Sequence, residues 1–149
     1  MNALALARGI TGFFAWTWPG SRELFDVHTE MAKVVARGSV SEFLLAGQPE
    51  KVSVGGDDEE GALRFVEAAL WKGKEQRQVL VEVVNGGSED IEGEFSLDLP
   101  VSASGIAEVA FGGLSWELRG GKLSIDTLPA MSTSFIILDL AESYLRLQV

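Results

Sequence analysis

A short apolar run, Ile10–Trp16, constrains the fold of this 149-residue chain more than any other feature. The run combines β-branched and aromatic residues, and it shows no regular alternation of polar and apolar side chains. It leads to two tryptophans, Trp16 and Trp18, and then to the turn dipeptide Pro19-Gly20. This pattern is typical of a strand that is covered on both faces, as in a parallel sheet packed between helices. Because such a strand is not stable alone, the rest of the fold must cover it.

Helical patterns lie on both sides of this run. Residues 2–8 are rich in Ala and Leu, which are strong helix formers, and Gly9 ends that helix. A second helix is predicted over Ser21–Arg37, with Ser21 as its N-cap. A third, Ser39–Ala46, begins at a capping-box sequence and ends at a glycine. The apolar residues of the second helix form one stripe at helical spacing, namely Leu24, Val27, Met31, Val34 and Val35.

From Lys51 onward the hydrophobic period changes from 3.6 to 2, which predicts strands. Glycine-rich turns separate the strands, and the pairs Gly112-Gly113 and Gly120-Gly121 each predict a tight hairpin. The side chains expected to face inward are Phe95, Leu97, Leu99, Trp116, Leu118, Ile125 and Leu138. The candidate strands are Lys51–Val54, Leu63–Trp71, Gln78–Asn85, Glu92–Leu99, Ile106–Phe111, Leu114–Arg119, Leu123–Leu128 and Thr133–Leu140.

The predicted fold class is mainly β: an antiparallel β-sandwich of about eight strands, preceded by a helix–strand–helix–helix segment. The chain accordingly divides into residues 1–48, which are mainly helical, and residues 50–140, which form the sandwich. Residues 141–149 form a tail with no clear pattern.

Composition excludes several classes of function. The formal net charge of −10 argues against nucleic acid as a partner, because phosphate binding needs a basic surface. The absence of cysteine removes disulfides, thiol catalysis and thiolate metal sites, and the single histidine, His28, removes any histidine-rich metal site. We expect no cofactor and no metal. We also expect no membrane partner, since no apolar run approaches the about 18 residues that a membrane span needs. The sequence carries no targeting signal, and so it does not fix the compartment.

Three other features each have a functional and a structural interpretation. His28 could act as a base, but it lies on a predicted helix without a nucleophile motif, which favours a surface role. The run Asp57–Glu60 lacks the alternating ligand spacing of a calcium loop, which favours a solvated turn. Trp71 and Trp116 could form a carbohydrate-binding face on the strands, although the alternation around Trp116 favours the core.

The order of these elements, together with Gly12-Phe13-Phe14-Ala15-Trp16-Thr17, resembles the C-terminal end of the TIM-barrel retaining glycoside hydrolases of the clan GH-A type. In that family the eighth barrel strand often has the form Gly-aromatic-aromatic-Trp-Ser/Thr, and its Trp lines the subsite for the sugar being cleaved. The resemblance transfers this role to Trp16 alone. It also implies that Ser21–Arg37 is the last barrel helix and that the sandwich is a C-terminal accessory domain.

One departure from the family is large. The acid/base and nucleophile glutamates of these enzymes lie on the fourth and seventh strands, which would precede Met1. Retaining hydrolysis needs two carboxylates about 5 Å apart, and no residue here matches them. The resemblance therefore implies a C-terminal fragment that has no catalytic residue and is inactive alone, whereas the full-length enzyme would bind and hydrolyse a carbohydrate.

Alternatives remain open at this point. Trp16 and Trp18 are the candidate substrate-binding residues, because their rings could stack on sugars, but core positions at the end of a strand are the alternative for both. A non-catalytic β-sandwich that binds carbohydrate or serves as a structural or interaction module is the second hypothesis. A small complete enzyme that uses Glu23, Asp26 and Glu30 is the third.

The fragment hypothesis carries a physical expectation. The apolar stripes of the helices would lack their barrel, so residues 1–48 would be uncovered and would tend to self-associate. They would then exchange amide protons faster than the sandwich, and their deletion would leave the sandwich folded.

Overall fold

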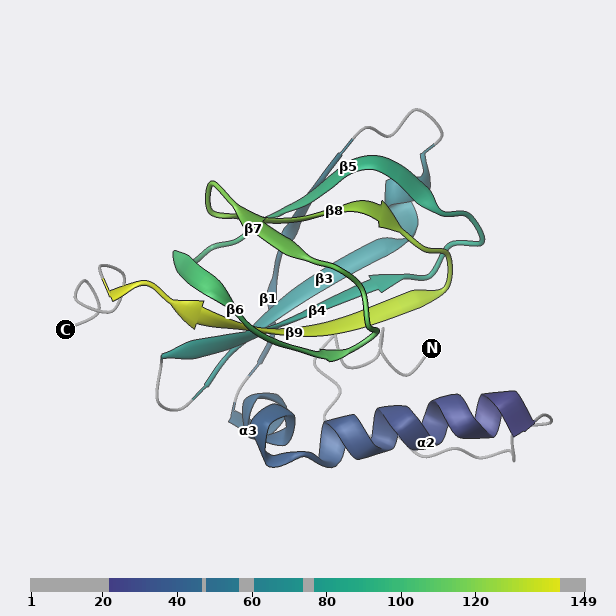
Figure 1. The fold of residues 1–149 in the computed structure, drawn as a ribbon, viewed down its shortest axis with the longest axis horizontal. Coiled ribbons are helices and arrows are strands. Elements are labelled where there is room, and N and C mark those ends of the chain that lie inside the picture. The colour runs from purple at the N-terminus through teal and green to yellow at the C-terminus, as the bar shows by residue number, and fades with distance from the viewer. Residues whose placement is uncertain (1–21, 47, 57–60, 74–76, 143–149) are drawn as a thin grey trace.

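The computed structural model describes residues 22–46, 48–56, 61–73 and 77–142. Two antiparallel sheets stack face to face, and a pair of helices lies against the outer face of one of them (Figure 1). The predicted mainly β architecture, an antiparallel sandwich preceded by helices, is therefore confirmed. The apolar run Ile10–Trp16 and the predicted helix before it lie outside the described residues.

The two sheets differ in size and in strand order. Sheet A has the order β1-β3-β4-β9-β6, and sheet B has the order β2-β5-β8-β7. The strands of sheet A are β1 Glu50–Lys51, β3 Val66–Lys72, β4 Gln78–Asn85, β6 Ala103–Phe111 and β9 Ser132–Leu140. The strands of sheet B are β2 Ser53–Gly55, β5 Ile91–Asp98, β7 Glu117–Arg119 and β8 Lys122–Leu128. The helices are α2 Arg22–Ala36 and α3 Gly38–Ala46, with a short 3₁₀ helix, η1 Ala62–Phe65.

The first predicted strand, Lys51–Val54, is divided between the two sheets. Its first part pairs with β3 of sheet A as β1, and its last part pairs with β5 of sheet B as β2. Between them Val52 is buried in the core, and its N–H donates to the Ala68 carbonyl (3.0 Å). One extended segment thus closes one side of the sandwich. The sequence does not reveal the change of sheet, because polar and apolar residues alternate with the same period of two in both parts.

The two glycine pairs have different roles. Gly120-Gly121 joins β7 to β8 in a two-residue hairpin, and both glycines have positive φ (56° and 81°), as a primed turn requires. The second predicted hairpin, at Gly112-Gly113, is wrong. This pair ends β6 in sheet A, and the chain then passes to β7 in sheet B.

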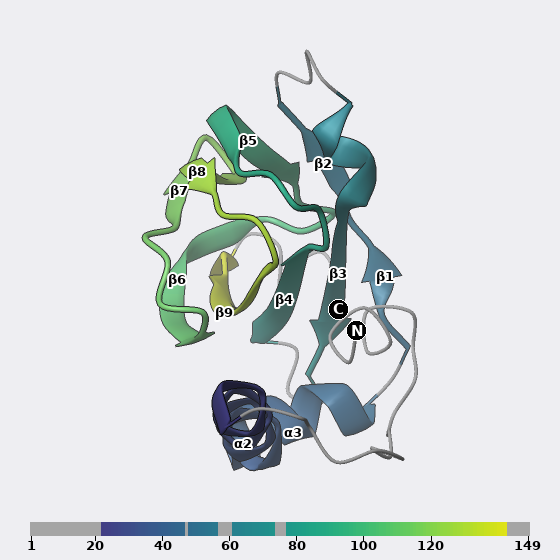
Figure 2. The same cartoon turned by 90° about the vertical axis from the view of Figure 1, so that its right-hand side faces the viewer.

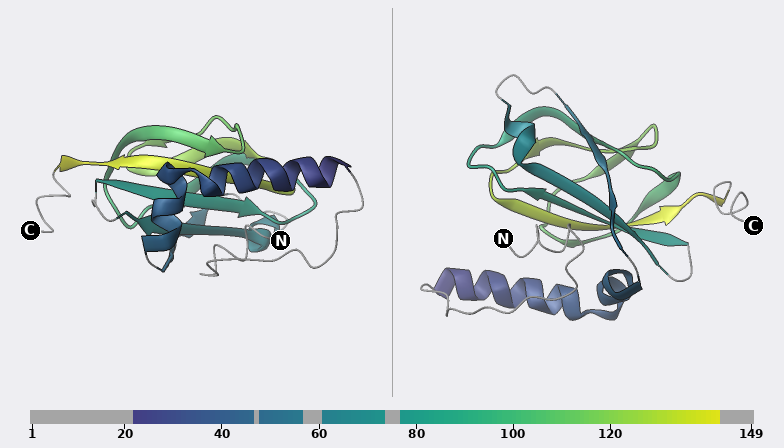
Figure 3. Two further views of the ribbon diagram at one scale, coloured as in Figure 1. Left: turned by 90° about the horizontal axis from the view of Figure 1, so that it is seen from below. Right: turned by 180° about the vertical axis from the view of Figure 1, so that it is seen from behind.

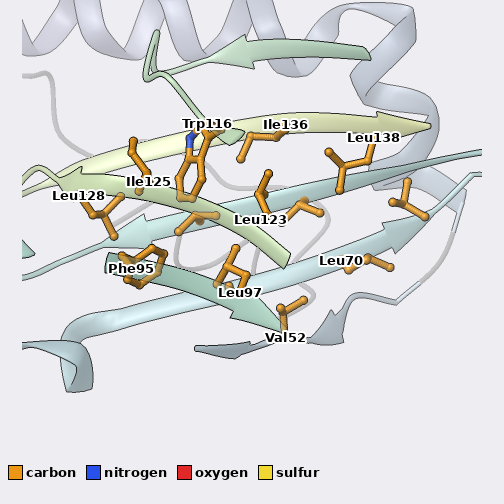
Figure 4. Close-up of a cluster of buried hydrophobic side chains, with 14 of the residues drawn as sticks. Val52, Leu70, Phe95, Leu97, Trp116, Leu123, Ile125, Leu128, Ile136 and Leu138 are labelled. Atoms are coloured by element: carbon orange, nitrogen blue, oxygen red, sulfur yellow. The ribbon is translucent and has the colours of Figure 1, made fainter. Parts of the chain in front are cut away.

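The space between the sheets is filled by one apolar cluster (Figure 4). Five of the residues predicted to face inward are buried in it: Phe95, Leu97, Trp116, Ile125 and Leu138. Leu99 packs at its margin, and Leu118 is only half-buried. Ser96 and Asp98, which alternate with Phe95 and Leu97 on β5, are half-buried and exposed respectively, so sheet B keeps one polar outer face.

The outer face of sheet A is covered by the helix pair α2–α3 (Figures 2 and 3). The expectation that the helix stripes lie uncovered without a barrel is therefore wrong for their described part. Arg37 directly follows α2, and its Nη2 donates a hydrogen bond to Glu108 Oε1 of β6 (2.7 Å). The buried cluster joins Met31, Val34, Val40, Phe43 and Leu44 of the helices to Ala69, Trp71, Leu80, Val84, Phe135 and Ile137 of the sheet.

Candidate functional site

The two candidate substrate-binding residues, Trp16 and Trp18, lie outside the described residues, so their role stays a prediction. The acidic run Asp57–Glu60 also lies outside them. His28 and Glu23 belong to α2, but their side chains are not among those described.

The other two tryptophans are buried. Trp71 is 3% exposed on the outer face of sheet A, beneath the helix pair, and Trp116 is 6% exposed between the sheets. Trp116 meets the Phe95 ring edge-on, with 6.1 Å between the ring centroids. The interpretation of these residues as a carbohydrate-binding face is therefore wrong, because neither ring is available to a sugar.

The acidic side chains of α2 that the structure describes, those of Asp26 and Glu30, form ordinary helix-surface pairs. Asp26 lies 3.9 Å from Arg22, and Glu30 lies 2.6 Å from Lys33, all with largely exposed side chains. Such pairs contribute little and do not shape a catalytic site. Within the described ranges no group of three or more His, Cys, Asp or Glu could hold a metal ion. No helix in those ranges is long and apolar enough to span a membrane.

A polar pocket of about 230 Å³ lies at the edge of sheet B, over β7 and β8. Its charged side chains are exposed, and Arg119 pairs with Glu117. It contains no aromatic ring on which a sugar could stack, so its composition is that of a solvated sheet face. The lining residues are Ser115, Glu117, Arg119, Ser124, Ile125 and Asp126.

Glu82 is the most unusual ionisable group among the described residues. It lies on β4, is fully buried, and has no hydrogen-bond partner on either carboxylate oxygen. Burial, and secondarily the charge of Glu67, raise its pKa to about 9. The sequence did carry a signal, since Glu82 is the single charged residue within the apolar run Val79–Val84.

Asn85, which is predicted as the last residue of the strand Gln78–Asn85, also anchors two loops. Its Nδ2 donates to the carbonyl oxygens of Glu89 (3.1 Å), Leu128 (3.4 Å) and Pro129 (3.1 Å). Its Oδ1 accepts from the Gly87 N–H (2.9 Å). The side chain is 1% exposed, so these bonds hold the β4–β5 and β8–β9 connections together at one end of the sandwich.

The comparisons with known proteins give one weak likeness. No protein-family model matches the sequence, and no curated protein matches it. Among solved structures, the chain is similar to alpha-L-fucosidase isoenzyme 2 from Paenibacillus thiaminolyticus, with 12% identity and a TM-score of 0.34. The match covers 62% of this chain and 16% of the fucosidase chain. The link is at the level of the fold and does not establish a shared family or activity.

Proposed function

We propose that this chain is the C-terminal, non-catalytic part of a retaining glycoside hydrolase, in which the sandwich supports a catalytic barrel. The observation that best supports this role is the docking of α2–α3 on sheet A. These helices directly follow the segment Gly12–Thr17, which resembles the last strand of such a barrel. Because the helices pack on the sandwich, they would join the two parts firmly rather than through a free linker.

The described chemistry is consistent with a non-catalytic role. Of the α2 carboxylates that the structure describes, those of Asp26 and Glu30 are engaged in helix-surface pairs. The buried carboxyl of Glu82 is closed off from solvent. The alternative, a free-standing structural or interaction module, shares this property. The two proposals differ in what the gene encodes before Met1: barrel strands that carry two catalytic glutamates, or an unrelated sequence.

We expect the purified 149-residue chain to show no turnover of aryl glycosides, including α-L-fucosides. The physical reason is that double displacement needs two carboxylates about 5 Å apart across the bond. The measurement is release of nitrophenol above a buffer blank, with a complete retaining glycosidase as the positive control. Turnover that remains constant through purification and is lost in Asp126→Asn or Glu82→Gln would contradict the proposal.

A longer product that includes the upstream coding sequence separates the two remaining possibilities. If that product hydrolyses a glycoside and loses activity when either upstream glutamate is replaced, the accessory role is supported. If the upstream sequence contains no such glutamates, the module hypothesis replaces it.

A further inference from the structure

Glu82 occupies the middle of the outer face of sheet A. Ala69 of β3 and Phe135 of β9 lie directly opposite it in the strand register. Leu80 and Val84 are its neighbours on the same face of β4, because side chains alternate along a strand. The carboxyl is thus surrounded by apolar groups and has no donor, which strongly disfavours its charged form.

The helix pair α2–α3 lies on this same face (Figures 2 and 3). For Glu82 to reach water, whatever covers the face must move, and α2 and α3 are the described elements that cover it. We propose that Glu82 is a proton-dependent latch: the helix pair stays docked on sheet A while the carboxyl is neutral, and loss of its proton releases the pair.

The charges around Glu82 act in the same direction. Glu67 of β3 is its diagonal neighbour, since Glu67 lies opposite Val84 and Glu82 lies opposite Ala69. A negative charge there further opposes ionisation of Glu82. On β9, Asp139 Oδ1 accepts a hydrogen bond from Gln78 at the far end of β4 (2.8 Å). The remaining charged side chains described on α2, α3 and β3 are exposed, namely Arg22, Asp26, Glu30, Lys33, Glu42 and Lys72.

The sign of the pH effect follows from these surroundings. The pKa of Glu82 is about 9 when docked, against 4.5 for an ordinary glutamate. The docked state therefore binds the proton more tightly than the open state. Docking is fully favoured below about pH 4.5, and the opening constant then rises about tenfold per pH unit until about pH 9.

The test is amide hydrogen exchange of the full chain between pH 5 and 9.5, corrected for the intrinsic exchange rate. It compares the wild type with Glu82→Gln, which keeps the shape and removes the ionisation. Glu42→Gln is the matched control, because it makes the same change at an exposed position of α3. We expect the opening constant of α2–α3 to rise about tenfold per pH unit in the wild type and in Glu42→Gln, relative to Glu82→Gln. Strands β5 and β8 should stay protected throughout.

Two results would overturn the latch: parallel pH profiles in the wild type and Glu82→Gln, or simultaneous loss of protection in α2–α3 and in β5 and β8. If Glu82→Gln does not fold, the test instead follows the ¹³C chemical shifts of the wild-type glutamate carboxyls as a function of pH. A carboxyl that titrates above pH 7 together with exposure of α2–α3 supports the latch. Titration of every glutamate below pH 6 overturns it.

Discussion

A variant that begins at Gln48, and so lacks α2 and α3, is expected to self-associate and to unfold at lower denaturant concentration than the full chain. Its outer sheet A face would expose Trp71, Leu80, Phe135 and Ile137 beside other apolar residues of the same cluster. Monomeric proteins rarely expose a contiguous apolar patch of more than a few hundred Å², because such patches associate. Light scattering coupled to size exclusion, together with urea unfolding, measures both effects.

Point variants on α3 separate lost packing from simple shortening of the chain. Phe43 is 6% exposed and packs in the helix–sheet cluster, whereas Leu45 is 76% exposed on the same helix. Phe43→Ala should weaken docking by roughly 3–5 kcal/mol, and Leu45→Ala should change stability by less than about 0.5 kcal/mol. For the variant that begins at Gln48, a monomeric state with an unchanged urea midpoint would contradict the predicted self-association and loss of stability. The sandwich would then be an independent domain.

Asn85→Ala is expected to lower the free energy of unfolding by about 3 kcal/mol. The change removes the donor to the carbonyl oxygens of Glu89, Leu128 and Pro129, of which the last keeps a bond from Ser132 Oγ. It also removes the acceptor of the Gly87 N–H. A buried polar group that loses its partner costs about 1–3 kcal/mol, and these losses partly overlap. Urea unfolding followed by tryptophan fluorescence measures the change.

Asn85→Asp tests the donor role of Asn85 more specifically than Asn85→Ala does. In three of the four hydrogen bonds of this side chain Nδ2 is the donor, and an aspartate has no such group. At pH 7 an aspartate would place a buried negative charge against carbonyl oxygens, so the loss should equal or exceed that of Asn85→Ala. Near pH 4 the protonated acid regains one donor and part of the stability. Gln78→Ala removes a solvent-exposed amide and serves as the control. Near-wild-type stability of Asn85→Asp at pH 7 would show that these bonds contribute little.

Local patterns predict the local elements of this fold well. The helix predicted over Ser21–Arg37 is observed as Arg22–Ala36, and the strand Gln78–Asn85 is observed with the same bounds. Both depend on periodicity over neighbouring residues, which the sequence displays directly. The Gly120-Gly121 hairpin is predicted for the same reason, because its turn geometry requires positive φ at both positions.

Long-range partners are not predicted in this way. An apolar stripe shows that a helix buries one side, but it does not show against what, so the stripe of α2 was assigned to an absent barrel. The near-continuous apolar run Val79–Val84 is the pattern of a strand buried on both faces, and it is the sequence feature that points to a cover on sheet A. Glu82, placed inside that run, has an environment that depends wholly on this cover. Trp16 and Trp18 lie outside the described residues and stay candidates.

The docking of α2–α3 on the sandwich is the central claim, and amide hydrogen exchange at pH 6 tests it most directly. Isolated helices of 15 and 9 residues are marginal in water, so their amides are well protected only if the helices are packed. We predict that the amides of Met31–Val35 and Val40–Leu44 exchange at least about 100-fold more slowly than in an unstructured peptide. Exchange within about tenfold of the unstructured rate in both helices, with β4 and β9 still protected, would contradict the account.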